Sequence, residues 1–350
     1  MIFRLNLIKL CFEVWNYIQP SNVSHLFRLM LIKLQSYRLN ISTIVSSFRS
    51  YNKYQTKSFI MSARIRPIEE ADAETCGKIG YNAHKSVSSA HGYPSEQPSE
   101  EYAIGLLRML LKNPNSYGIL AERGKQILGS IFLHKFPPSP IAVVGPLTVD
   151  PAIEGGGVGR ILMDAVISHA YGQNYDKVRL VQSPSHIRSY VLYTKSGFTL
   201  REPLFLMQGN VIKDNSNIRD LELHKVETDK DILECNKLCI QAHGFTREGE
   251  LRHAVGQGVA IEIERGGKIY GYSAGLGLFG HSIASSNDDL KALIAGTSII
   301  TGPGFFVPAK NREIVLWLLE QGFRIQWPAN LMTLGPYEEP TIPFLPSLAY

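Results

Sequence analysis

The stretch Val149-Asp-Pro-Ala-Ile-Glu-Gly-Gly-Gly-Val-Gly-Arg160 holds four glycines within five positions of this 350-residue chain. An apolar run, 141–149, leads into it and predicts a strand, and the residues from Val158 to about Ala170 predict a helix. Glycine lets the backbone turn sharply and lets an anion approach it closely. The unpaired N–H groups and the positive dipole end of the helix then converge on one point. The sequence therefore predicts a site for a phosphate-bearing ligand.

Two well-known phosphate loops do not fit this glycine spacing. A P-loop requires Gly-Lys-Ser/Thr, and no such pair follows Val149. A dinucleotide loop requires Gly-x-Gly-x-x-Gly, and Arg160 stands where its third glycine would permit close helix–strand packing. This departure weighs against a nucleotide-binding oxidoreductase. A turn that serves only geometry is a further alternative, although glycines this dense would weaken a purely structural helix start.

The pattern that remains is Val-x-Pro, a polar residue, two further residues and Gly-x-Gly. It resembles motif A of the GNAT-type N-acetyltransferases, whose loop binds the pyrophosphate of acetyl-CoA. Val149, Pro151, Gly157 and Gly159 match this motif, whereas Glu154 stands where the family usually has Gln or Arg. The resemblance implies that the following residues bind the cofactor: Leu147, Val149, Glu154, Gly155, Gly156, Gly157, Val158, Gly159 and Arg160.

A second motif supports the same family. Leu192-Tyr193-Thr-Lys-Ser-Gly197-Phe198 includes the end of a predicted helix, capped by Gly197, and resembles the end of motif B, Leu-Tyr-x-Lys-x-Gly-Phe. The resemblance implies that Tyr193 protonates the leaving CoA thiolate. It also makes His186 a cofactor contact, at a position where the family often has Asn. The two motifs lie about 30 residues apart, each beside a predicted strand, and together they are more specific than either alone.

The order of predicted elements fits this family. We expect an α+β fold in which a mixed, mostly antiparallel sheet is flanked by helices, as in GNAT domains. A polar loop is expected at residues 86–99. The predicted helices and strands of the first half are helices at 70–85, 100–112, 158–170 and 187–195, and strands at 65–68, 117–121, 126–133, 141–149, 177–181 and 199–207.

The resemblance implies an acetyl-CoA-dependent N-acetyltransferase that needs no metal. A primary amine, from a small molecule or a peptide, would attack the thioester directly in a ternary complex. The alternative is a non-catalytic sensor that binds acyl-CoA. The amine must lose a proton, and four residues are candidate bases by type alone, although His134, at the end of a predicted strand, is more easily explained as structural. These candidates are His84, Glu96, Glu122 and His134.

The chain is long enough for two domains. We predict a GNAT domain at 64–210, a polar linker at 211–218 and a second, diverged GNAT-like domain at 219–350. The stretch 312–323 echoes the ending of motif B, but no Gly-x-Gly follows Ile299. The fold would therefore hold two tandem copies, with one working cofactor site.

Three short segments of the second half are distinctive, the first two for their His, Arg and Glu side chains. They are 243–251, 280–281 and 345–347. Both a substrate-facing surface and ordinary solvated loops fit this composition.

Residues 1–60 differ in composition from the rest. They contain eight of the 36 basic residues and one of the 31 acidic residues, so the remainder has a net charge of −2. The remainder is therefore not a basic nucleic-acid binder. The segment is too interrupted by charge to span a membrane, and it fits either a mitochondrial presequence or translated sequence upstream of a start at Met61. We favour the second, and with it a cytoplasmic protein.

The four cysteines do not form a disulfide framework. Cys235 and Cys239 lie four residues apart on a predicted helix, with no second ligand pair nearby to complete a zinc site. We expect both to be buried thiols in a reducing compartment.

Overall fold

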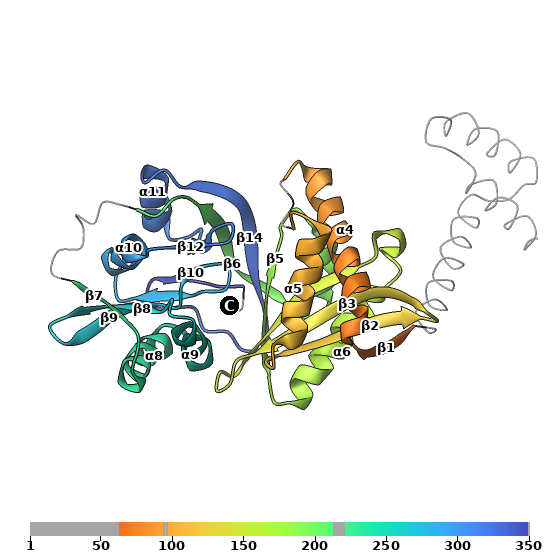
Figure 1. The fold of residues 1–350 in the computed structure, drawn as a ribbon, viewed down its shortest axis with the longest axis horizontal. Coiled ribbons are helices and arrows are strands. Elements are labelled where there is room, and N and C mark those ends of the chain that lie inside the picture. The colour runs from red at the N-terminus through yellow and green to blue at the C-terminus, as the bar shows by residue number, and fades with distance from the viewer. Residues whose placement is uncertain (1–62, 94, 96, 213–220, 349–350) are drawn as a thin grey trace, which may run out of the picture. The chain divides into compact units, whose positions relative to one another are not determined.

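The computed structural model describes residues 63–93, 95, 97–212 and 221–348 (Figure 1). The predictions for residues 1–60, and for all but two residues of the linker, lie outside this range. Within it the strands form an eight-stranded, a five-stranded and a two-stranded sheet. No helix in the described part of the chain is both long and apolar enough to cross a bilayer.

The first half, up to Ile212, has the predicted order of elements. One prediction was wrong: the expected loop at 86–99 begins as helix, because α4 continues to His91 and ends only where Gly92 adopts a left-handed conformation, with φ of 69°. The elements are β1 (Arg64–Pro67), α4 (Ala73–His91), α5 (Glu100–Lys112), β2 (Ser116–Arg123), β3 (Gln126–Lys135), β4 (Ile141–Val149), α6 (Val158–Gly172), β5 (Lys177–Gln182), α7 (Ile187–Lys195) and β6 (Thr199–Gln208).

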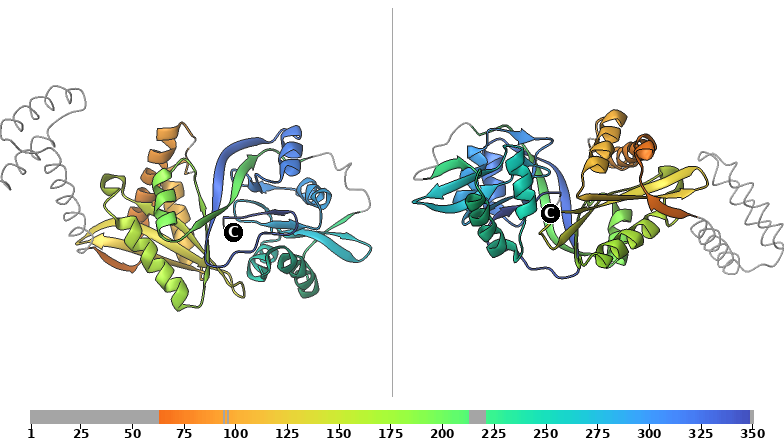
Figure 2. Two further views of the ribbon diagram at one scale, coloured as in Figure 1. Left: turned by 180° about the vertical axis from the view of Figure 1, so that it is seen from behind. Right: turned by 60° about the horizontal axis from the view of Figure 1, so that its bottom comes forward.

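Helices cover both faces of the sheet in this half. Figure 2 shows α4 and α5 on one side of β2 and β3 and α6 on the other. Every residue of β3 from Leu128 to Leu133 is accordingly buried, rather than every second one. Leu120 and Phe132 pack under α4 and α5 in one hydrophobic cluster. The next strand of this sheet is β4.

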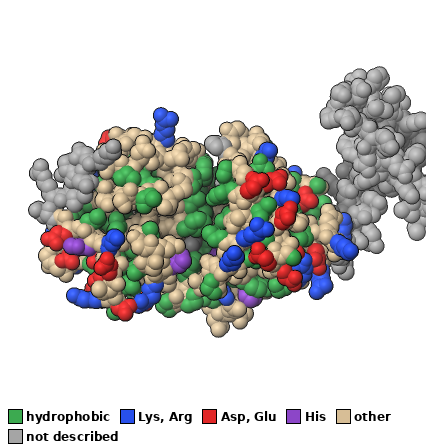
Figure 3. All heavy atoms as spheres, in the orientation of Figure 1, with side chains coloured by type: hydrophobic (Ala, Val, Ile, Leu, Met, Phe, Trp, Pro, Cys, Tyr) green, Lys and Arg blue, Asp and Glu red, His purple; other side chains and the backbone are tan. Residues whose placement is uncertain are grey.

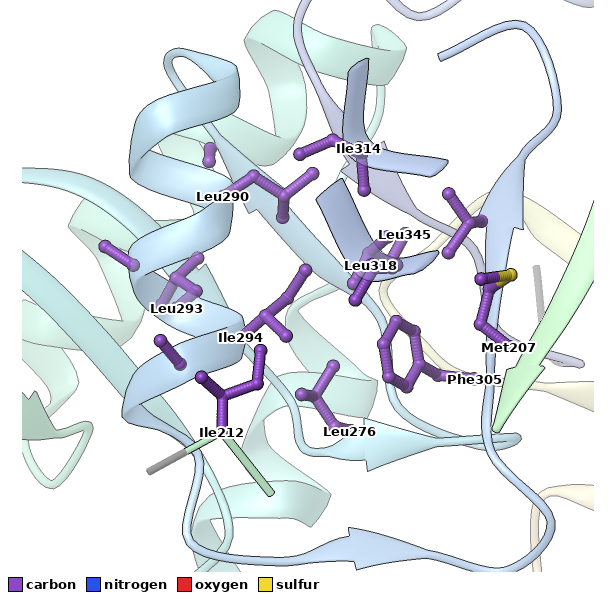
Figure 4. Close-up of a cluster of buried hydrophobic side chains, with 14 of the residues drawn as sticks. Met207, Ile212, Leu276, Leu290, Leu293, Ile294, Phe305, Ile314, Leu318 and Leu345 are labelled. Carbon is purple, nitrogen blue, oxygen red and sulfur yellow. The ribbon is translucent and has the colours of Figure 1, made fainter. Parts of the chain in front are cut away.

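The second half repeats the scheme. Figure 4 shows Leu290, Leu293 and Ile294 of one helix packing toward Leu318 of another, with Phe305 beside them. The predicted burial of Cys235 and Cys239 is confirmed, since neither is exposed. The elements are β7 (Glu222–Lys225), α8 (Asp229–His243), α9 (Glu248–Gly256), β8 (Ile261–Arg265), β9 (Lys268–Ser273), β10 (Leu276–Gly277), β11 (Ser282–Ala284), α10 (Asn287–Gly296), β12 (Ile300–Thr301), β13 (Phe305–Pro308), α11 (Arg312–Glu320), β14 (Arg324–Leu334) and β15 (Phe344–Leu345).

The two halves exchange strands. The eight-stranded sheet has the order β1-β2-β3-β4-β5-β14-β6-β13, so β14 lies between β5 and β6. The units β5-α7-β6 and β13-α11-β14 are thereby interleaved. Strands of the second half thus flank β6, the last strand of the first half, on both sides.

The predicted fold class is confirmed. Within the eight-stranded sheet of the described chain, β4 and β5 are the one parallel pair, and helices flank the sheets. The division into two domains at 211–218 stays a proposal. Because the halves exchange strands, the eight-stranded sheet contains strands from both of them.

Candidate active site

A cleft opens where β4 and β5 diverge. The two strands pair only through Ile141–Val143 and Lys177–Arg179. Beyond these residues the strands border a cavity of about 810 Å³, whose walls include Val144–Val149 of β4 and Val181–Ser183 after the point of divergence. The backbone groups on this edge of β4 have no strand beside them, so they are available to a ligand. The other edge of β4 pairs with β3.

The glycine loop forms one end of this cavity. Gly155 and Gly157 have φ of 85° and 87°, a conformation that side chains disfavour. Gly159 serves another purpose, because a Cβ at this position would lie 3.2 Å from Leu192 Cδ2 of α7. Gly157 caps α6 without a side-chain hydrogen bond, and the first turn contains no acidic residue. The leading N–H groups and the dipole of α6 are thus presented to an anion.

Glu154 forms an ion pair with Arg188 and lies close to His186. Arg188 Nη1 lies 2.6 Å from one of its carboxylate oxygens, and His186 Nε2 lies 3.3 Å from the other. These contacts connect the glycine loop to the start of α7. An acid where the family has Gln or Arg is therefore compatible with an anion site, because its charge is balanced by Arg188 of α7.

Tyr193 lies on α7 and faces the cavity. Burial raises the pKa of its hydroxyl to about 12, so the group keeps its proton at neutral pH. Gln182, at the end of β5, forms a hydrogen bond with the residue that precedes this helix. The Gln182 side-chain nitrogen donates to the His186 carbonyl at 3.1 Å, and its oxygen accepts from Asn330 of β14 at 2.9 Å. The second half thus contributes to the position of the tyrosine.

The predicted site residues converge on this cavity. Of the eleven residues implied by the two motifs, Gly156 is the one that does not line it; Gly156 instead donates from its N–H to the Ile153 carbonyl within the loop. The residues that line the cavity are Leu147, Val149, Glu154, Gly155, Gly157, Val158, Gly159, Arg160, His186 and Tyr193.

Residues 83–198 match the family model of the acetyltransferase (GNAT) family. The chain carries a GNAT acetyltransferase domain. The resemblance inferred from the two motifs is thereby confirmed. No match was found among curated proteins.

Solved structures extend the GNAT fold beyond this domain. A candidate acetyltransferase from Pyrococcus horikoshii aligns with a TM-score of 0.58 and 15% identity over 80% of this chain and 92% of its own. A GCN5-related N-acetyltransferase from Sphaerobacter thermophilus aligns with a TM-score of 0.54 and 14% identity over 79% of this chain and 98% of its own. A tandem GNAT protein from the clavulanic acid biosynthesis pathway aligns over 79% of this chain and its whole length, with 14% identity and a TM-score of 0.46. The first two similarities include the second half.

The candidate bases lie in different environments. His84, on α4, lines the cavity of the GNAT domain. Glu122 instead accepts a 2.9 Å hydrogen bond from Arg66 at the opposite edge of the sheet. His134 is enclosed between the Ser116 hydroxyl, 2.8 Å from Nδ1, and the Gly145 carbonyl, 2.6 Å from Nε2. Burial lowers its pKa, which fits a structural role. Glu96 lies outside the described residues.

The second half supplies cavity residues that sequence reasoning missed. They come from β13, β14 and the C-terminal segment. No local sequence pattern identifies them, because they reach the GNAT domain only through the exchange of strands between the halves. They are Phe306, Trp327, Ala329 and Leu348.

The three distinctive segments of the second half form a buried network, so both expectations for them were wrong. The Arg247 guanidinium donates to Glu250 at 3.0 Å and to the Ser347 hydroxyl at 2.8 Å. His281 Nδ1 lies 3.3 Å from the Glu250 carboxylate, and its Nε2 lies 2.9 Å from the Tyr272 hydroxyl. Each polar group gains a partner when the three segments meet, which permits burial.

Proposed function

We propose that this protein transfers the acetyl group of acetyl-CoA to a primary amine by direct attack in a ternary complex. The observation that supports this most strongly is the uncapped start of α6 beside the unpaired edge of β4, both in one cavity with Tyr193. A helix start suits a pyrophosphate, and a free strand edge suits the amide groups of pantetheine. The family match to 83–198 supports acetyl transfer in general.

Each part of the site has a role in this reaction. The backbone of Leu147–Val149 polarises the thioester carbonyl, a form of oxyanion stabilisation. The amine nitrogen attacks the carbonyl carbon, and the bond between that carbon and sulfur breaks. Tyr193 donates its proton to the leaving thiolate. His84 takes the proton lost by the amine, since among the candidate bases within the described chain it is the one that lines the cavity.

Two measurements test this proposal together. Isothermal titration should give one acetyl-CoA per chain, and a thiol assay should detect free CoA when amines are added. Tyr193→Phe should lower kcat about 100-fold and leave the Kd of acetyl-CoA unchanged, because the hydroxyl acts only on the leaving group. Ser196→Ala, on the same helical turn but outside the cavity, is the matched control. Binding without CoA release for any amine would favour the sensor, and absence of binding would refute both functions.

A further inference from the structure

The wall of the cavity opposite the glycine loop is apolar. The second half contributes four side chains to it, of which Phe306 and Ala329 are buried while Trp327 and Leu348 are partly exposed. Figure 3 shows apolar side chains along the middle of the visible face, with Lys, Arg, Asp and Glu concentrated on either side. The cavity thus has a polar end at the loop and an apolar wall.

Strand register explains this wall. Residues directly opposite each other in antiparallel strands share a face of the sheet. Trp327 on β14 is opposite Leu206 on β6, and Leu206 is opposite Phe306 on β13. Val181 of β5 is likewise opposite Leu331 of β14. The exchanged strands therefore build one continuous apolar face, which belongs to a single hydrophobic cluster and ends at the cavity.

The buried network fixes the C-terminal part of the wall. The Leu348 N–H donates to the Leu278 carbonyl at 2.6 Å, and the preceding Ser347 is bound by Arg247. Ser347 is fully buried. Leu348 is therefore held as a fixed part of the wall, which favours recognition of one acceptor shape.

The charged side chains that line the cavity limit which amines can be the acceptor. Among the described residues that line the cavity, Glu154 is the one carboxylate, and it is already paired with Arg188. A second ammonium group of a diamine or polyamine would lose its hydration against the apolar wall without gaining an anionic partner. A hydrocarbon or aromatic body would instead gain from burial there.

We propose that the acceptor is a primary monoamine carried on an apolar or aromatic body, with Trp327 and Leu348 as the residues that bind this body. This inference rests on the proposed acetyl transfer. Specificity would thus come from the second half, whereas the cofactor is bound by the first.

The test compares amines of different charge in the full-length protein. With saturating acetyl-CoA, phenethylamine should have a kcat/KM about 100-fold above that of spermidine or propane-diamine. Trp327→Ala should raise KM for phenethylamine about tenfold and leave the Kd of acetyl-CoA unchanged. Ile325→Ala, an exposed residue of the same strand outside the cavity, is the matched control and should change neither value.

Two results would overturn the acceptor assignment. One is preference for spermidine or the diamine, and the other is an unchanged KM for phenethylamine in Trp327→Ala. Either result would leave the proposed acetyl transfer intact. Absence of CoA release with every amine, the polyamine included, would instead contradict the acetyl transfer itself.

Discussion

The two halves begin corresponding helices in opposite ways. Helix α6 starts at Gly157 without a side-chain cap or an acid in its first turn. Helix α10 starts at Ser286, whose hydroxyl accepts from the Asp289 N–H, and its first turn contains Asp288 and Asp289. Acids there stabilise the helix through its dipole and repel a phosphate. An N–H group at the start of α10 thus already has a hydrogen-bond acceptor in the chain, the Ser286 hydroxyl.

The strands that precede these helices differ in how many of their edges are paired. One edge of β4 is unpaired over Val144–Val149, whereas β11 pairs on both edges, with β9 and with β15. The β15 pairing joins Ser282 to Leu345 and Ile283 to Phe344. The proposed cofactor site combines an uncapped helix start with an unpaired strand edge. In the second half, Ser286 caps the start of α10 and β15 pairs with the edge of β11. Leu348, shortly after β15, lines the apolar wall of the cavity.

The largest effect should follow from disrupting the network that fills the second half. Arg247→Leu leaves the Glu250 carboxylate buried without its main partner, and should cost about 3–5 kcal/mol of unfolding free energy. Denaturant titration measures this loss. Arg252→Leu is the matched control on the same helix, since its ion pairs with Glu248 and Asp229 are exposed and it should cost much less. Equal losses would show that burial of the pair is unimportant.

The next largest effect should follow from giving the first turn of α6 the acidic residues that α10 has. Gly159→Asp with Arg160→Asp places acids at the second and third helical positions, where α10 has Asp288 and Asp289. Acetyl-CoA should bind about 100-fold more weakly, because charged hydrogen bonds to phosphate are lost. Titration calorimetry measures the Kd.

Two controls separate charge from shape in that experiment. Gly159→Ala adds only the Cβ that would lie 3.2 Å from Leu192 Cδ2. Gly105→Asp adds an acid to α5, where a Cβ meets open space and the cavity is not touched. If Gly159→Ala weakens binding as much as the double variant, sterics rather than electrostatics would explain the glycine.

The third prediction concerns pH. Burial, with a smaller contribution from Arg247, lowers the pKa of His281 from 6.5 to about 4. Between these values the unfolded chain binds a proton that the folded chain does not, so the contribution to stability is complete above pH 6.5 and is lost as the pH falls toward 4. The loss should reach about 2–3 kcal/mol.

Unfolding free energies measured at pH 7, 5.5 and 4.5 would test this dependence. His281→Gln should make the pH dependence shallower over this range, because one of the buried histidines with a lowered pKa is gone while His134 and His243 remain. His253→Gln, an exposed substitution on α9, should leave the slope as it is in the unaltered protein. A slope in His281→Gln equal to that of the unaltered protein would assign the acid sensitivity to other groups.

Local signals made the first half predictable. The glycine loop and the Tyr193–Phe198 ending each depend on neighbours in sequence, so their strand and helix contexts could be predicted from the residues alone. The end of α4 was missed because the serines after Lys85 read as loop, although Gly92 is the residue that ends the helix. Serine is unfavourable in helices only by a small amount, which packing overrides.

Long-range pairing made the rest unpredictable. Trp327 reaches the cavity because β14 pairs with β5 and β6, which lie over a hundred residues earlier in the chain. Arg247, His281 and Ser347 read as polar loop residues singly, and become a buried network only when the fold brings them together. Residue type indicates that such groups need partners but not which partners they find.

The smallest effect should come from Glu154, the residue that departs most from motif A. Its pairs with Arg188 and His186 are partly exposed, so they contribute little to stability. Glu154→Gln removes a negative charge beside the proposed phosphate site and frees Arg188 to interact with the phosphates of acetyl-CoA. Acetyl-CoA should bind about 2–3-fold more tightly at low ionic strength, and the gain should shrink with added salt.

The matched control for this substitution is Glu74→Gln, which breaks an exposed pair with Lys78 on α4, away from the cavity. It should leave the Kd of acetyl-CoA unchanged at every salt concentration. If Glu154→Gln weakens binding instead, the carboxylate acts mainly by holding the glycine loop to α7. The first half would then, like α10, use an acid to stabilise its own helix start, and the contrast between the halves would depend on the open edge of β4 alone.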